Sequence, residues 1–101
     1  MTNSTEIYPA KLLAALESAS ATGSAALEAL ALDARGEWGR AHQRVAAVED
    51  RDACWVHAYL HRKEGDLGNA GYWYRRAGRE PATNSLEEEW RGIAAALLVG
   101  R

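Results

Sequence analysis

Hydrophobic positions recur every three or four residues along most of the chain, which is the spacing of one face of an α-helix. A clear stripe runs through Leu86, Trp90, Ile93 and Leu97 near the end of the sequence. No segment alternates hydrophobic and polar positions over a useful length, so strands are not expected. The pattern therefore predicts an all-α protein.

Start and stop signals divide this pattern into separate helices. Pro81 cannot sit inside a helix, so residues 79–84 are predicted to form a loop. Ser85 and Glu88 can each accept the other's backbone N–H in a capping box, which begins the last helix. The first predicted helix begins at Pro9 and stops at Thr22 and Gly23. The fourth begins at Asp50 or Asp52 and ends at about Glu64. The second, third, fifth and last cover about 25–35, 37–48, 67–77 and 86–97.

The middle of the chain repeats itself at an offset of 29 residues. Residues 36–41 line up with residues 65–70, and each segment begins with a glycine followed by an acidic residue. Each unit is thus a helix, a tight turn and a second helix. Because such a hairpin cannot bury its apolar face alone, the two hairpins are expected to stack.

The second unit, residues 54–78, resembles a tetratricopeptide repeat. Gly65 and Asp66 match the turn of that family, Ala70 matches its small residue where the two helices cross, and Tyr74 matches its aromatic residue. The resemblance implies antiparallel helix-turn-helix pairs, here with flanking N- and C-terminal helices. It also implies that Ala70 and Tyr74 are buried.

The sequence departs from this family in two respects. His61 stands where a second aromatic residue is usual, and the offset of 29 residues is shorter than the family's repeat of about 34. Residues 55–78 are also similar to a stretch in small bacterial proteins of no assigned activity. What the tetratricopeptide resemblance implies about function is protein interaction, through a short concave groove, through self-association, or not at all if the helices close into a bundle.

Three consecutive aromatic residues stand out in the second unit. Tyr72, Trp73 and Tyr74 sweep about 200° of a helix, so one stripe cannot bury all three. Tyr74 belongs to the core, Trp73 is expected to pack on a neighbouring element, and Tyr72 is expected to point outward. Aromatic and arginine side chains are favoured at interfaces. The predicted partner-binding residues are Tyr72, Trp73, Arg75, Arg76, Arg79, His57 and His61. The alternative is that the arginines cover their own core and pair with residues 87–89.

A second hypothesis comes from Cys54, His57, His61 and Glu64. Their spacings of three, four and three place all four near one face of a helix, and histidines at i and i+4 can share a metal ion. The alternative is a polar helix face, or histidines that are partly buried and hydrogen-bonded. The glutamate that follows the first histidine in zincins is missing. No residue is therefore assigned as a metal ligand. A small helical bundle that binds a metal ion or small ligand through this Cys/His/His/Glu face remains the alternative function.

Composition narrows the function classes further. The net charge is −2, so neither nucleic acid nor a membrane surface is an expected partner. The single cysteine excludes an intrachain disulfide and fits a cytoplasmic protein. No catalytic motif or cofactor motif is present, so no enzyme and no cofactor are expected. A polar, disordered segment over 1–8 and one helical domain over 9–101 are expected, with a protein partner or a second copy of the chain as ligand.

Overall fold

The computed structural model describes residues 10–20 and 23–99, and this part of the chain is helical and contains no strand. The all-α prediction is confirmed. The predicted disordered segment 1–8 lies outside the described residues, as does Pro9. The helices are α2 (Ala10–Ser20), α3 (Ala25–Ala34), α4 (Trp38–Ala46), α5 (Arg51–Glu64), α6 (Leu67–Ala77) and α7 (Leu86–Val99).

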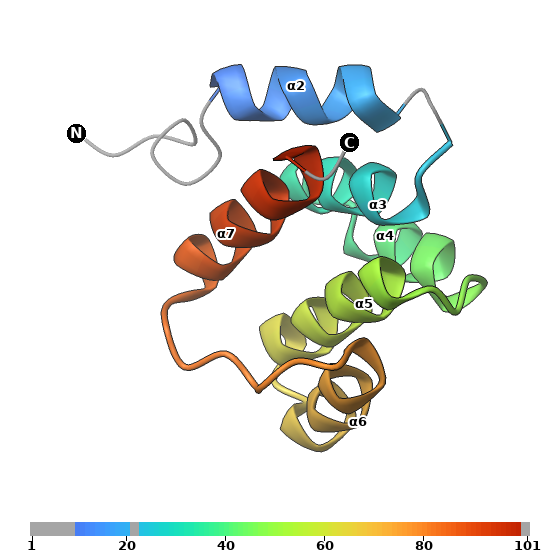
Figure 1. Ribbon diagram of the computed structural model, residues 1–101, viewed down its shortest axis with the longest axis vertical. Helices are drawn as coiled ribbons and strands as arrows, with labels where there is room; N and C mark the ends of the chain where they lie inside the picture. The colour runs from blue at the N-terminus through green and yellow to red at the C-terminus, as the bar shows by residue number, and fades with distance from the viewer. Residues whose placement is uncertain (1–9, 21–22, 100–101) are drawn as a thin grey trace.

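The two repeat units form two helix-turn-helix pairs, α3 with α4 and α5 with α6 (Figure 1). Gly36 and Gly65 occupy equivalent places in the two turns, with positive φ angles of +83° and +92°. Glycine suits both places because other residues rarely adopt this left-handed conformation. The offset read from the sequence is therefore the period of the helical hairpins.

Short polar side chains begin the helices where the sequence suggested. Of the two candidate caps of α5, Asp50 accepts a hydrogen bond from the backbone N–H of Ala53 at 2.7 Å. Ser85 and Glu88 each accept the other's backbone N–H at 3.1 Å, so the capping box at the start of α7 is confirmed. Such caps satisfy N–H groups that a helix cannot bond internally.

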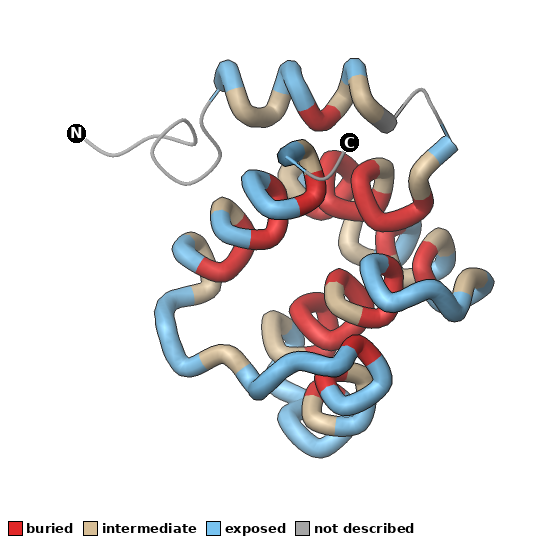
Figure 2. The backbone as a smooth tube through the Cα atoms, in the orientation of Figure 1, coloured by how far each residue is buried: buried red, intermediate tan, exposed pale blue. Residues whose placement is uncertain are grey.

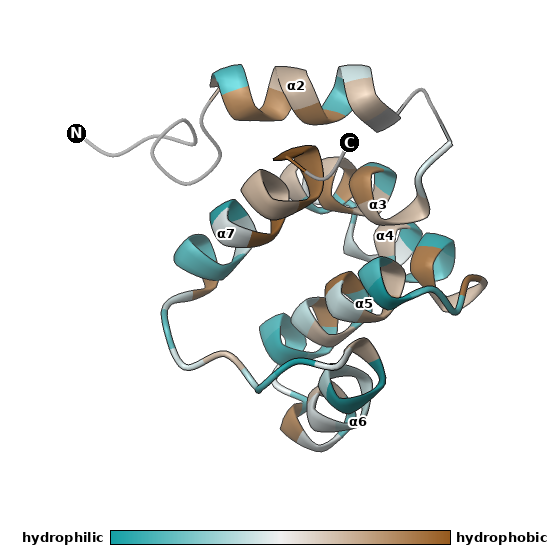
Figure 3. Cartoon of the chain, viewed as in Figure 1, coloured by the Kyte–Doolittle hydropathy of each residue, from teal (hydrophilic) through white to brown (hydrophobic). Residues whose placement is uncertain are grey.

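The helices pack around α5, which contacts α3, α4, α6 and α7. In Figure 1, α2 lies across one end of the molecule and α6 lies at the other, while the loop after α6 leads back to α7. Figure 2 shows that buried positions follow the inner faces of α3, α5 and α7. Figure 3 shows hydrophobic residues on these same faces.

The main core joins α7 to the first repeat unit. Trp90 is fully buried, and its indole N–H donates to the backbone oxygen of Leu30 at 3.2 Å. Ile93 and Leu97 of the predicted stripe are also buried. The last helix is therefore held by the residues that its hydrophobic spacing indicated.

A smaller buried cluster holds α5 against α6 and consists of Ala58, Ala70 and Tyr74. The two alanines let the helices approach closely, and the tyrosine fills the space beside them. The predicted burial of Ala70 and Tyr74 is confirmed. Within the described residues, no helix is both long enough and apolar enough to span a bilayer.

Candidate functional site

The predicted partner-binding residues of the α5–α6 hairpin differ in their exposure to solvent. Tyr72 is 44% exposed, and Arg75, Arg76 and Arg79 are exposed as well. Trp73 is half-buried. In contrast, His57 and His61 are only 4% and 8% exposed, so they lie beneath the surface that the other five residues form or border.

The two buried histidines meet a third one, His42, from α4. One ring nitrogen of each of the three lies within 4.8 Å of one from each of the others. We call His42, His57 and His61 the histidine cluster. The chain contains three histidines in all, and the fold gathers every one of them at the interface between α4 and α5.

Two tryptophans enclose the histidine cluster. The ring of Trp38 stacks on that of His42 with 5.0 Å between centroids, and the ring of Trp73 stacks on that of His57 at 4.0 Å. Trp38 is held in place because its indole N–H donates to the backbone oxygen of Leu60 at 2.9 Å. The cluster therefore joins α4, α5 and α6 through one continuous series of ring contacts.

One buried ring nitrogen of the cluster has no hydrogen-bond partner among the described residues, while other ring nitrogens are bonded. The Nε2 atoms of His57 and His42 lie 3.1 Å apart, and Nδ1 of His61 lies 2.7 Å from Oε2 of Glu64. The second ring nitrogen of His57, Nδ1, is buried and has no hydrogen-bond partner in the described part of the chain. A buried polar atom without a partner is unusual in a folded protein and calls for an explanation.

Burial keeps two of the three rings neutral. Desolvation, together with the positive charges that His42 and His61 carry when protonated, lowers the pKa of His57 to about 4. Desolvation and the charge on His61 also lower the pKa of His42. Both rings are therefore unprotonated at neutral pH and keep a lone pair available.

We expect acid to destabilise the protein through His57. Between pH 6.5, its ordinary pKa, and about 4, the unfolded chain binds a proton that the folded chain does not. Stability should therefore be fully present above pH 6.5 and fall by about 3 kcal/mol as the pH drops to 4. Urea unfolding at a series of pH values, with a chelator present, measures this. A His57→Gln variant should lose this part of the slope, and an unchanged slope would contradict the assignment.

The cysteine predicted on the same helix face does not belong to the cluster. The thiol of Cys54 is buried and lies 3.7 Å from the backbone oxygen of Glu49. It is not part of the group formed by the three histidines. The third member is His42, which sequence reasoning missed. The sequence spacing could have pointed to His42, because it follows Trp38 by four residues and so shares its helix face.

The arginines around α6 are placed over aromatic rings. The guanidinium carbon of Arg76 lies 5.7 Å from the ring centroid of Tyr72 and 5.4 Å from that of Trp73. The guanidinium carbon of Arg79 lies 3.3 Å from the ring centroid of Trp55. These are cation–π arrangements. We call Tyr72, Trp73, Arg75, Arg76 and Arg79 the arginine–aromatic surface.

Carboxylates neutralise little of this surface. Arg76 reaches the exposed Glu49 at 3.4 Å, while Arg75 and Arg79 pair with no carboxylate among residues 10–20 and 23–99. The predicted pairing with the start of α7 occurs at another arginine, since Arg62 bonds Glu89 at 2.9 Å.

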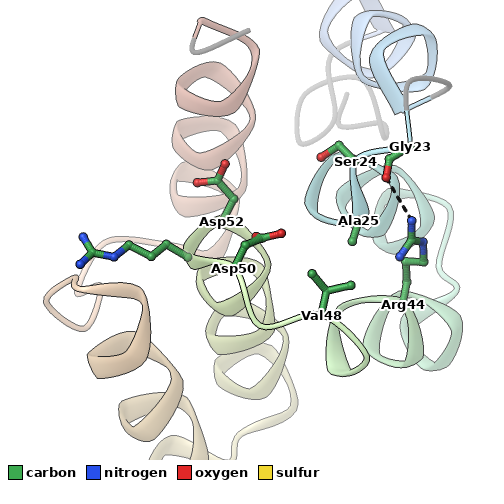
Figure 4. Close-up of a pocket in the computed structure, with 8 residues that line it drawn as sticks. Gly23, Ser24, Ala25, Arg44, Val48, Asp50 and Asp52 are labelled. Atoms are coloured by element: carbon green, nitrogen blue, oxygen red, sulfur yellow. Dashed lines mark hydrogen bonds between the residues drawn. The ribbon is translucent and has the colours of Figure 1, made fainter.

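Two surface cavities lie away from the histidine cluster. One of about 410 Å³ lies where α3 and α5 begin, and in Figure 4 its residue Arg44 donates to the backbone oxygen of Gly23. Three of the polar groups that line this cavity already have structural roles: Arg44 also pairs with Glu28, Asp50 caps α5 and Ser24 caps α3. The other, of about 450 Å³, is lined by Trp55, Arg79 and Ile93 among others. This second cavity borders the arginine–aromatic surface.

Comparison of the chain with protein-family models, curated proteins and solved structures gave no match. Function must therefore be inferred from the residues and their geometry.

Proposed function

We propose that this chain is a protein-interaction module that binds an acidic segment of a partner through the arginine–aromatic surface. The observation that carries the proposal is the presence of two exposed arginines, Arg75 and Arg79, without a carboxylate partner in the described residues, beside the half-exposed Tyr72. Arginine binds carboxylates with two parallel hydrogen bonds, and it is enriched with tyrosine at the energetic centres of interfaces.

A cavity of about 450 Å³ adjoins the surface. Trp55, Ala82, Ile93 and Arg79 line it, and so do the carboxylates Glu80, Glu88 and Glu89. Because these carboxylates would repel an acidic side chain, the proposal rests on the exposed arginines and Tyr72 and not on the cavity.

The partner is either another protein or a second copy of this chain. The chain has its own acidic residues at the surface, including Glu80 and Glu88 near the start of α7. The tetratricopeptide-like residues of the second unit support binding as the function, because that family commonly holds peptides or helices. No catalytic residue is part of the proposal.

Charge reversal at Arg75 and Arg79 should abolish the association. The double variant Arg75→Glu/Arg79→Glu replaces two attractive charges by two repulsive ones, while both positions are exposed and leave the core intact. We expect at least a 10-fold loss of affinity for the partner, and weaker binding of the wild type as salt rises. Affinity capture followed by titration of the captured partner, and sedimentation for self-association, measure the effect.

Arg40→Glu is the matched control, since Arg40 is an exposed arginine of α4 that bonds Glu37 of its own helix start. It should bind like the wild type. Equal capture of the same partner by wild type and the double variant would remove the arginine–aromatic surface from the interface.

A further inference from the structure

We propose that His42, His57 and His61 together bind one divalent transition-metal ion, for which Zn²⁺ is the natural probe. The inference goes beyond the proposed interaction and does not rest on it. Imidazole nitrogen is a preferred ligand of zinc, copper and nickel, and three histidines are enough to hold zinc with a coordination position left over.

The distances fit such a site. A zinc–nitrogen bond of about 2.05 Å places two ligand nitrogens about 2.9 Å apart at a right angle and about 3.3 Å apart in a tetrahedral arrangement. The Nε2 atoms of His42 and His57 lie 3.1 Å apart. One ring nitrogen of each histidine lies within 4.8 Å of those of the other two. Small rotations about the side-chain torsions bring all three to bonding distance.

A carboxylate supports one of the ligands in the manner of known metal centres. Oε2 of Glu64 lies 2.7 Å from Nδ1 of His61, so Nδ1 is the nitrogen that donates and Nε2 keeps its lone pair. Histidines that bind metals usually donate their other ring N–H to a carboxylate or carbonyl, which fixes the tautomer and raises the basicity of the ligand.

The neighbours of His57 fix the orientation of its ring. The ring stacks on Trp73 and on His61, with centroid distances of 4.0 Å and 4.9 Å. Ligands whose orientation is fixed before binding give a site higher affinity.

The metal-free cluster has a simple description. One of the two facing Nε2 atoms carries a hydrogen and donates it to the other across 3.1 Å. A metal ion takes the place of this hydrogen between the rings, and the proton moves to Nδ1 of the ring that carried it, so that both Nε2 lone pairs face the ion. The competing interpretation, a purely structural histidine pair, predicts no ion binding at all.

The test is metal titration of chelator-treated protein without a histidine tag. Isothermal titration with Zn²⁺ at neutral pH should give one ion per chain with a Kd of about 1 μM or tighter. Co²⁺ should give visible absorption bands whose intensity reports the coordination geometry. Saturating Zn²⁺ should raise the Tm by about 10 °C, because the ion binds only the folded state.

Variants identify the ligands. His42→Gln is the principal one, since His42 is half-buried and its replacement leaves the core intact. It should weaken Zn²⁺ binding at least about 100-fold, while Glu64→Gln should weaken it about 10-fold. Cys54→Ala is the control, because the thiol lies outside the cluster, and it should bind like the wild type.

Three results would overturn the proposal. The first is wild-type binding weaker than about 1 mM or without a defined stoichiometry. The second is a His42→Gln variant, shown by circular dichroism to be folded, that binds as tightly as the wild type. The third is loss of binding in Cys54→Ala, which would place the ion on the thiol and not on the histidine cluster.

Discussion

Replacement of Trp90 by alanine is expected to lower the free energy of unfolding by about 3–5 kcal/mol. Trp90 is fully buried and contributes the largest side chain of the main core. The change leaves a cavity, and it also removes the indole N–H that satisfies the backbone oxygen of Leu30. A domain of this size has a total stability of about 5–15 kcal/mol, so the loss is a large part of the total.

Chemical unfolding followed by far-ultraviolet circular dichroism measures this loss. Val99→Ala is the matched control, since Val99 lies on the same helix and is 85% exposed. It should change stability by no more than about 0.5 kcal/mol. Trp90→Phe should fall between the two, because it retains much of the volume but loses the hydrogen bond. A loss below about 1 kcal/mol in Trp90→Ala would contradict the packing described for α7.

The helices and their ends were predictable because their signals are local. The capping pair Ser85 and Glu88 requires only neighbouring residues, as does the left-handed glycine at Gly65. The boundaries differ little from those predicted. The largest differences are two residues: α4 was expected to reach Val48 and ends at Ala46, and α7 was expected to reach about Leu97 and ends at Val99.

The orientation of the three aromatics on α6 was also predictable. Successive residues of a helix are rotated by about 100°, so only one of them can face the core. Tyr74 is buried, Trp73 is half-buried against His57, and Tyr72 is exposed, as expected. Helical geometry and the alanine at position 70 decide this without knowledge of the remaining fold.

The histidine cluster was not predictable, since it depends on how two helices cross. His57 and His61 share a face of α5 and were recognised by their spacing. His42 lies on α4, and the repeat offset aligns it with Gly71, so the internal repeat gives no indication of its role. Only the packing of α4 on α5 shows that the three rings meet and that Cys54 remains outside.

Long-range packing also decided the partners of the charged residues. The sequence left open whether the arginines bind a partner or pair with residues 87–89. In the structure, the loop between α6 and α7 brings Glu89 to Arg62 of α5 and to the hydroxyl of Tyr74. Arg62 also donates to the backbone oxygen of Asn84 in that loop. This buried network fastens the loop and α7 to the second repeat unit.

The second large effect is expected at Glu89. Glu89→Ala should lower the free energy of unfolding by about 3–5 kcal/mol, because it leaves the largely buried guanidinium of Arg62 without its carboxylate. It also removes the acceptor of the Tyr74 hydroxyl, whose pKa is raised by burial and by this hydrogen bond, so that the hydroxyl remains a donor. Chemical unfolding measures the loss, and Glu87→Ala, a neighbouring carboxylate outside the network, should change stability by no more than about 0.5 kcal/mol.

A double-mutant cycle separates the network from a general effect of lost packing. Tyr74→Phe alone should lower stability by about 1 kcal/mol, because it removes one hydrogen bond and leaves an acceptor of Glu89 unpaired. In the Glu89→Ala background the same change should have a smaller effect, since the hydroxyl has already lost the carboxylate to which it donates. Additive losses would show that Tyr74 and Glu89 act independently, and α7 would then be held mainly by the hydrophobic contacts of Trp90.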